Sequence, residues 1–215
     1  MMDTDKDKGY QYLIKAQKAY ANQDFFKALQ YFQKAAKKGV VEAYYNLGAM
    51  YNNGFGIGQD YQKAIENYKK AADMGLAEAY SNLASMHANG QGVPQDYSKA
   101  LESLRKATNM GVAEAYTALG SMYYEGQGVV KDYSKAMEHY QKAANMGDVK
   151  ACFHLGLVYA RGQDVPKNYS KARQYFQKAR IWGMALLVIT WELCIVKDKV
   201  FLKTILKPCN IFKKQ

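Results

Sequence analysis

Apolar residues recur along the chain with the period of an α-helix, in pairs of neighbouring stretches. Residues 42–53 carry them mostly three or four positions apart, and residues 61–74 do the same after a glycine-rich loop. The apolar positions are Ala43, Leu47, Met50 and Tyr51 in the first stretch, and Tyr61, Ala64, Tyr68 and Ala71 in the second. Such spacing gathers each set on one face of a helix. The pattern therefore predicts two antiparallel amphipathic helices.

The whole pattern returns every 36 residues. The recurring positions include Gly39, Gly75, Gly111, Gly147 and Gly183, then Tyr61, Tyr97, Tyr133 and Tyr169, and then Asp24, Asp60, Asp96, Asp132 and Asn168. A fixed period of this length is typical of solenoids, in which each hairpin buries its apolar face only against its neighbours. We therefore predict an all-α fold, a right-handed α-solenoid of antiparallel helix hairpins.

Local signals mark the ends of these helices. Gly54 and its later copies follow the first helix, where a left-handed residue is expected. Asp60, Asp96, Asp132 and Asn168 precede the second helix and are placed to cap it. A small residue follows the helical leucine in every unit, at Gly48, Ala84, Gly120 and Gly156. We expect the partner helix to approach closely at that position.

These residues carry a resemblance to a known family. The run Gly-Gln-Gly-Val-Pro-Gln-Asp-Tyr-Ser-Lys-Ala at residues 90–100, with Glu-Ala-Tyr-x-x-Leu-(Gly/Ala)-x-Met before it, resembles the Sel1-like repeat. That family is a relative of the tetratricopeptide repeat with a longer loop inside each hairpin, and the resemblance covers residues 42–179. The opening hairpin departs from it, because its turn at residues 21–24 is the short tetratricopeptide kind.

The period also divides the chain. We expect residues 1–9 to be a flexible N-terminus and residues 10–39 to be a tetratricopeptide-like capping hairpin. Residues 40–179 are expected to hold four Sel1-like repeats. Their bounds are 40–75, 76–111, 112–147 and 148–183, and the last repeat is disturbed at its end. The period vanishes after Ala179, so residues 180–215 form an anomalous tail.

The tail is predicted to be a fifth repeat read out of frame. In the shifted reading frame, each codon consists of the third base of one codon and the first two bases of the next. Two of these shifted codons must encode glycine: the one that joins the codons of Trp182 and Gly183, and the one that joins the codons of Trp191 and Glu192. If suitable third bases are chosen for the codons from Leu187 onward, the shifted frame encodes a further repeat whose end matches residues 29–35. A one-nucleotide insertion or deletion near codon 180, in the gene or in its sequencing, explains this pattern, and resequencing tests it. The alternative is a divergent capping helix.

Charge and composition add little chemistry. The formal net charge is +11, of which seven basic and two acidic residues from position 180 onward supply +5 and residues 1–179 only +6. A modest excess along helices indicates a solvated surface and no nucleic-acid binding. The longest apolar stretch, residues 184–196, is shorter than the ~20 residues that span a bilayer. The first eight residues are charged and lack a signal peptide's apolar core, so we expect a cytoplasmic location.

No pattern of catalytic or metal-binding residues is visible. His87, His139 and His154 stand alone, and Cys152 replaces a tyrosine, so we expect packing roles and neither metal nor cofactor. The glycine-rich loops fit turns better than phosphate sites. We therefore predict that the protein is not an enzyme. The alternative is β-lactam binding or hydrolysis, as in an exported, cysteine-rich branch of the family. That branch has paired cysteines in each repeat, whereas one cysteine lies within the repeats here.

Partner recognition is predicted at positions whose residues vary between repeats, while the packing positions of the helices stay the same. On each first helix such positions lie four, three and one residues apart, and form one stripe opposite the packed face. By resemblance to tetratricopeptide proteins, this stripe lines a concave groove that binds a peptide or helix of another protein, with Tyr45, Tyr124 and Phe153 as anchors. The predicted groove residues are Tyr45, Ala49, Asn52, Asn53, Ser81, Ser85, Asn89, Thr117, Ser121, Tyr124, Glu125, Phe153, Leu157 and Arg161. The resulting function is a non-catalytic scaffold or adaptor; plain surface variation is the alternative.

Overall fold

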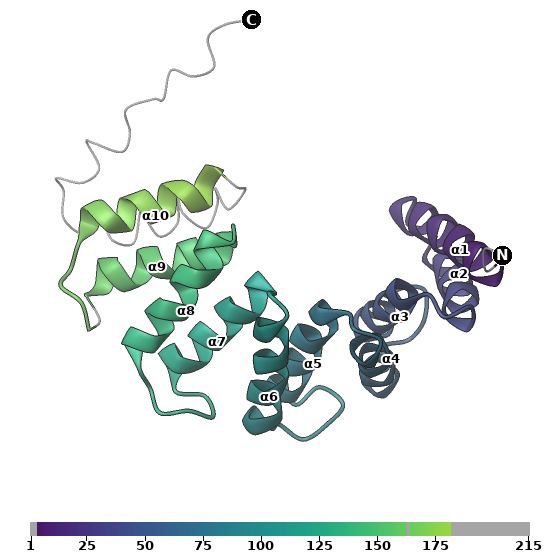
Figure 1. The fold of residues 1–215 in the computed structure, drawn as a ribbon, viewed down its shortest axis with the longest axis horizontal. Helices are drawn as coiled ribbons and strands as arrows, with labels where there is room; N and C mark the ends of the chain where they lie inside the picture. Colours follow the sequence, from purple (N-terminus) through teal and green to yellow (C-terminus); the bar gives the residue numbers. More distant parts are fainter. Residues whose placement is uncertain (1–3, 163, 182–215) are drawn as a thin grey trace, which may run out of the picture. The chain divides into compact units, whose positions relative to one another are not determined.

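The computed structural model describes residues 4–162 and 164–181, which form ten α-helices and no strand (Figure 1). The first hairpin consists of α1 (Thr4–Ala21) and α2 (Phe25–Lys37). The later helices are α3 (Val41–Asn53), α4 (Tyr61–Asp73), α5 (Ala77–Asn89), α6 (Tyr97–Asn109), α7 (Ala113–Glu125), α8 (Tyr133–Asn145), α9 (Val149–Arg161) and α10 (Tyr169–Ile181). The predicted all-α solenoid of helix hairpins is confirmed.

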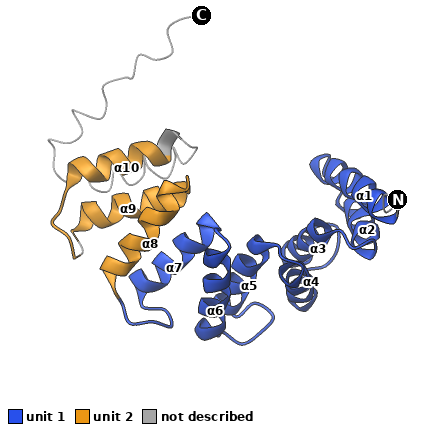
Figure 2. Ribbon diagram, viewed as in Figure 1, with its two compact units in different colours: residues 1–131 blue, residues 132–215 orange. Residues whose placement is uncertain are grey.

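The helices fall into two compact units, residues 1–131 and residues 132–215 (Figure 2). Unit 1 contains α1 to α7, and its core includes the nearly fully buried side chains of Phe32, Met50 and Met86. Unit 2 contains α8 to α10, with Tyr140 and Leu155 among its most buried side chains. Burial of large side chains at these positions contributes to the stability of each unit.

Helices within a hairpin approach closely where the sequence has a small residue. A Cβ added to Gly48 would lie 2.7 Å from Cδ1 of Tyr68 in α4. A Cβ added to Gly156 would lie 2.5 Å from Cε1 of Phe176 in α10. No larger residue fits beside these rings without a shift of the helices. The predicted close approach is therefore confirmed at Gly48 and Gly156.

The second helices begin at the predicted capping residues. Oδ1 of Asp60 accepts a hydrogen bond of 3.0 Å from the backbone N–H of Lys63. Asp96, Asp132 and Asn168 cap α6, α8 and α10 in the same way. Each cap satisfies one backbone donor that the helix leaves unpaired, and contributes about 1 kcal/mol.

In each of the three long loops of unit 1, a glycine lies against the preceding repeat. Gly92 has a φ of 71°, and a Cβ added to it would lie 2.5 Å from Cβ of Tyr61 in α4. Gly56 and Gly128 lie in the same way against the start of α2 and of α6. In unit 2 the corresponding residue is Asp164, which also has a positive φ of 53°. The loops therefore contribute contacts between repeats in addition to reversing the chain.

Replacing Gly92 with alanine is expected to destabilise the protein by about 1–3 kcal/mol, because the new methyl group meets Tyr61 and the backbone there is left-handed. Gly58→Ala is the matched control, since a Cβ added to Gly58 has no neighbour within 4 Å. Urea denaturation of the two variants and the unaltered protein measures the difference. Equal midpoints for all three would contradict the proposed contact.

The N-terminal boundary differs from the prediction that residues 1–9 are flexible. Helix α1 begins at Thr4, and Gly9 is buried inside it. A Cβ added to Gly9 would lie 2.7 Å from Cγ2 of Val40, so α1 packs directly against the segment that follows α2. Asp5 also forms an ion pair of 2.9 Å with Lys38. These contacts extend the helix toward the N-terminus.

The predicted out-of-frame repeat, residues 180–215, lies outside the described residues except for its first two positions. Arg180 and Ile181 complete α10, which has 13 residues like α4, α6 and α8. Neither residue type breaks a helix, so α10 extends two residues beyond the end of the periodic pattern. Among the described helices, none has both the length and the apolar character needed to cross a membrane.

Candidate partner-binding groove

The predicted groove residues lie on α3, α5 and α7 of unit 1 and on α9 of unit 2. Five of them are exposed: Asn53, Ser85, Asn89, Glu125 and Arg161. Seven are half-buried: Tyr45, Ala49, Asn52, Ser81, Ser121, Tyr124 and Leu157. The remaining two, Thr117 and Phe153, are buried. Unit 1 thus holds most of the predicted groove.

Phe153 is not the exposed anchor that the sequence predicts, and Thr117 is also covered. Phe153 is only 9% exposed, and its ring centroid lies 5.7 Å from that of Phe176 in α10. Tyr45 makes the same contact with Tyr68 of α4, at 5.7 Å, and stays half-buried. Burial against the second helix stabilises these rings. Burial also raises the pKa of the Tyr68 hydroxyl.

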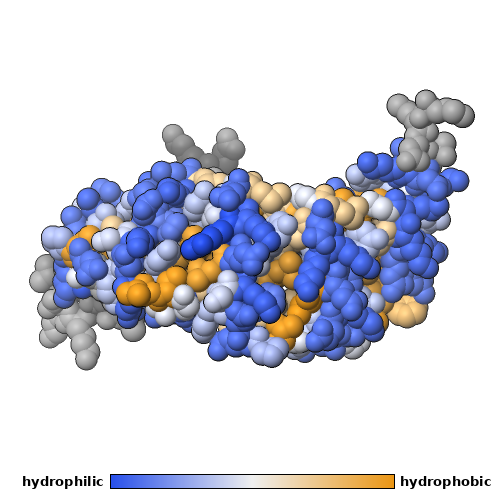
Figure 3. Space-filling model, turned by 60° about the horizontal axis from the view of Figure 1, so that its bottom comes forward, coloured by the Kyte–Doolittle hydropathy of each residue, from blue (hydrophilic) through white to orange (hydrophobic). Residues whose placement is uncertain are grey.

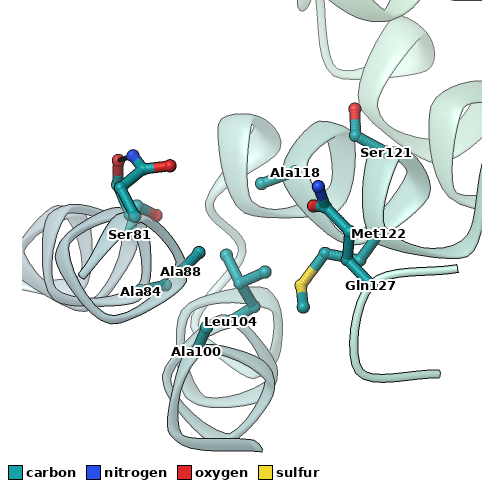
Figure 4. A pocket seen from close by; sticks show the side chains of 11 residues that line it. Ser81, Ala84, Ala88, Ala100, Leu104, Ala118, Ser121, Met122 and Gln127 are labelled. Atoms are coloured by element: carbon teal, nitrogen blue, oxygen red, sulfur yellow. Dashed lines mark hydrogen bonds between the residues drawn. The ribbon is translucent and has the colours of Figure 1, made fainter. Parts of the chain in front are cut away.

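A pocket opens in unit 1 where the equivalent side chains are smaller. Ser81 stands 36 residues after Tyr45, and Leu104 stands 36 residues after Tyr68. This smaller pair leaves a hollow of about 200 Å³ between α5, α6 and α7 (Figure 4). Its lining consists of Ser81, Ala84, Ser85, Ala88, Asn89, Ala100, Leu104, Ala118, Ser121, Met122 and Gln127. Four predicted groove residues therefore surround one pocket.

The pocket has apolar walls and a hydrogen-bonding rim. Figure 4 shows Leu104 and Met122 pointing into the space between α5 and α7. On the rim, Nδ2 of Asn89 donates to Oγ of Ser85 at 3.2 Å. Oγ of Ser81 is buried and has no hydrogen-bond partner among the described residues. Because a buried hydroxyl without a partner costs free energy, a ligand group that bonds to it is favoured.

An aromatic cluster at the start of the stripe was not predicted. Tyr20 of α1 corresponds to Asn52 once the shorter turn of the first hairpin is allowed for, and it is 39% exposed. Its ring centroid lies 5.3 Å from that of Phe25 and 6.1 Å from that of Phe55, and these two phenylalanine rings stack at 4.9 Å. Aligning the first hairpin with the later repeats is the signal that could have found Tyr20.

Apolar surface is also exposed outside this pocket. On the face shown in Figure 3, apolar patches lie between bands of hydrophilic side chains. Grooves that bind protein segments commonly combine an apolar centre with a polar rim. The pocket between α5 and α7 has this composition on a smaller scale.

The histidines and Cys152 have packing environments. The ring of His154 stacks on that of Tyr140, with centroids 4.8 Å apart, and burial lowers the pKa of His154. Burial likewise lowers the pKa of His87 and of His139. Burial raises the pKa of the Cys152 thiol, which opposes thiolate chemistry. Among the residues that the structure describes, no group of three or more His, Cys, Asp or Glu side chains could hold a metal ion.

Comparison with known proteins gives one family and several related structures. The family model described as the Sel1 repeat matches residues 17–40, 41–76, 77–112, 113–148 and 149–180. The first match falls within the opening hairpin, which the sequence predicts to be tetratricopeptide-like, so the family model gives five matches where the sequence predicts four repeats. No curated protein matches the chain.

Three solved structures illustrate the similarity. A protective antigen of uropathogenic Escherichia coli with an SLR fold is 36% identical over 81% of this chain, with a TM-score of 0.72, and the chain spans 38% of the antigen's length. A Sel1 repeat protein from Oxalobacter formigenes is 28% identical, with a TM-score of 0.76, covering 92% of this chain and 79% of that one. An immunity protein from Pseudomonas aeruginosa is 25% identical, with a TM-score of 0.57, covering 76% and 64%.

Proposed function

Because the chain belongs to the Sel1 repeat family, we propose that it is a non-catalytic scaffold or adaptor that binds a segment of another protein in the groove of unit 1. Sel1 repeats mediate protein–protein interactions. The observation that carries the proposal is the pocket between α5, α6 and α7, where Ser81, Ser85, Asn89 and Ser121 surround apolar walls.

In the proposed complex, an apolar side chain of the partner enters the pocket beside Ala88, Leu104 and Met122. Burial of that side chain supplies affinity at about 25 cal/mol per Å² of apolar area. The hydroxyl and amide groups of Ser85 and Asn89 bond to polar groups of the partner and fix its orientation. No charged side chain lines the pocket, so the inserted side chain is expected to be uncharged.

Filling the pocket with the variant Ser81→Phe is expected to abolish partner binding while the fold is retained. The repeats themselves support this expectation, because Tyr45 and Phe153 already occupy the equivalent position. Ser98→Phe is the matched control: it adds the same side chain on the exposed start of α6, where the first hairpin carries Phe26. Quantitative cross-linking and mass spectrometry compare the proteins captured from one lysate by the unaltered chain and both variants.

The result that supports the proposal is loss of specific partners by Ser81→Phe with their retention by Ser98→Phe. Recovery of the same partners at the same level by all three proteins would sink the groove assignment. Circular dichroism of both variants establishes that the helices are intact.

A further inference from the structure

The N-terminal edge of the array carries a polar surface that the groove does not use. An internal first helix buries three positions of one face, Ala43, Leu47 and Met50 in α3. Leu47 there belongs to the same buried core cluster as Ala36 of the preceding hairpin. In α1 the equivalent residues are Gln11, Lys15 and Lys18, all exposed. A polar outer face is expected of a capping repeat, but capping alone requires no excess of one charge.

Five lysines of the later second helices form ion pairs within their own repeat. The ion pairs are Lys63–Asp60 at 3.0 Å, Lys99–Asp96 at 3.5 Å, Lys106–Glu102 at 2.8 Å, Lys135–Asp132 at 3.4 Å and Lys142–Glu138 at 2.8 Å. The equivalent lysines of the first hairpin are Lys27 and Lys34. In the part of the chain that the structure describes, neither of them forms an ion pair.

The sequence explains this difference. Gln30 precedes Lys34 by one helical turn, where α4, α6 and α8 carry a glutamate and α10 carries Gln174. Asp24 caps α2 through the backbone N–H of Lys27, at 3.2 Å, and makes no ion pair with the Lys27 ammonium group. Lys27 and Lys34 are therefore without the ion pairs that Lys99, Lys106, Lys135 and Lys142 form.

These side chains converge on a hollow of about 340 Å³ between α1 and α2. Lys15, Lys18 and Lys27 line it, together with Asn22, Asp24 and Tyr31. Tyrosine rings hold the neighbouring ammonium groups. Nζ of Lys34 lies 5.5 Å from the ring centroid of Tyr31 and 5.8 Å from that of Tyr12, and Nζ of Lys15 lies 6.0 Å from that of Tyr12. Such cation–π contacts position an ammonium group without removing its charge.

We propose that this basic edge, formed by Lys15, Lys18, Lys27 and Lys34, binds an acidic peptide segment of a partner protein. The charge of the surface selects the occupant, because ammonium groups form strong hydrogen bonds to carboxylates. Nucleic acid fits the surface less well. Asp24 borders it on one side and Asp7 lies two helical turns before Lys15, about 12 Å away, whereas a duplex presents a continuous row of phosphates.

Fluorescence anisotropy of a fluorescein-labelled hexaglutamate peptide with the full chain tests this inference. The variant Lys15→Gln/Lys18→Gln/Lys27→Gln is expected to weaken binding about tenfold, since it removes three exposed charge contacts. The matched control is Lys69→Gln/Lys106→Gln/Lys142→Gln, which loses the same three charges from exposed positions of internal second helices. We expect the control to bind within about twofold of the unaltered chain, and binding to weaken with added salt.

Three outcomes would overturn the proposal. One is an equal loss of affinity in both triple variants, which indicates attraction to the net charge of +11 alone. Another is the absence of saturable binding by hexaglutamate. The third is tighter binding of a labelled DNA duplex that depends on the same edge lysines, which identifies a nucleic-acid surface. Thermal unfolding of each variant separates loss of binding from loss of fold.

Discussion

Replacing Phe176 with alanine is expected to destabilise unit 2 by about 3–5 kcal/mol. Phe176 is 4% exposed, and its ring lies against Phe153 and over the backbone of Gly156. Because Gly156 has no side chain, nothing on that side can move to fill the space that the ring leaves. A cavity between α9 and α10 results, and the free energy of unfolding falls by the lost burial and the cavity together.

Hydrogen exchange measured by mass spectrometry locates this effect. Protection is expected to fall throughout α9 and α10, and to change little in α1 to α4, because repeat arrays couple mainly through nearest neighbours. Gln177→Ala, at the exposed neighbouring position, is the control and is expected to exchange like the unaltered chain. Unchanged protection of α9 in Phe176→Ala would contradict the role given to this ring.

Acidification from pH 7.5 to pH 5 is expected to destabilise unit 2 through His154. Burial lowers the pKa of His154 below its ordinary 6.5, so the unfolded chain binds a proton more readily than the folded chain. The stability from neutral His154 is therefore complete above pH 6.5 and is lost as the pH falls below that value. At low pH, each pKa unit by which His154 is lowered corresponds to a loss of about 1.4 kcal/mol in the free energy of unfolding.

The variant His154→Phe is expected to show a smaller loss of stability over the same pH range, because it keeps a ring beside Tyr140 and removes the titrating group. The capping aspartates do not interfere. The hydrogen bonds to Asp60, Asp96 and Asp132 lower their pKa from an ordinary 3.8, so their contribution is lost only in more acidic solution. Urea midpoints at several pH values provide the measurement. Parallel pH profiles for the two proteins would refute the assignment to His154.

The fold could be predicted almost completely because its signals are local and repeated. The capping carboxylate of Asp60 and the small residue at Gly48 each act within one hairpin, and each recurs at a fixed interval. One repeat therefore predicts the next. The start of α1 could not be predicted in this way, because Gly9 packs on Val40 and Asp5 pairs with Lys38. Both contacts join residues more than thirty positions apart, and Asp5 and Gly9 precede the periodic pattern.

The candidate groove could be predicted only in part, because variation between repeats has two causes. Tyr45 and Phe153 pack against the rings of Tyr68 and Phe176 on the second helix, whereas Ser81 and Leu104, at the equivalent positions, line a pocket. Phe153 thus varies to fill space beside Phe176, whereas Ser81 beside Leu104 leaves a pocket. A stripe pattern identifies the helix face and does not distinguish these cases. The size of the paired residue on the second helix does.

The ion pairs of the second helices also bear on how arrays of this kind grow. Each described ion pair from Lys63–Asp60 to Lys142–Glu138 joins residues three or four positions apart within one repeat. A repeat that is copied or deleted as a block carries both members of these ion pairs with it, and the ion pairs of the neighbouring repeats stay undisturbed. Changes in the number of repeats by gene duplication therefore leave the ion pairs of the other repeats intact. The apolar faces and the loop residues must still match, and Gly56, Gly92 and Gly128 are alike in the first three long loops.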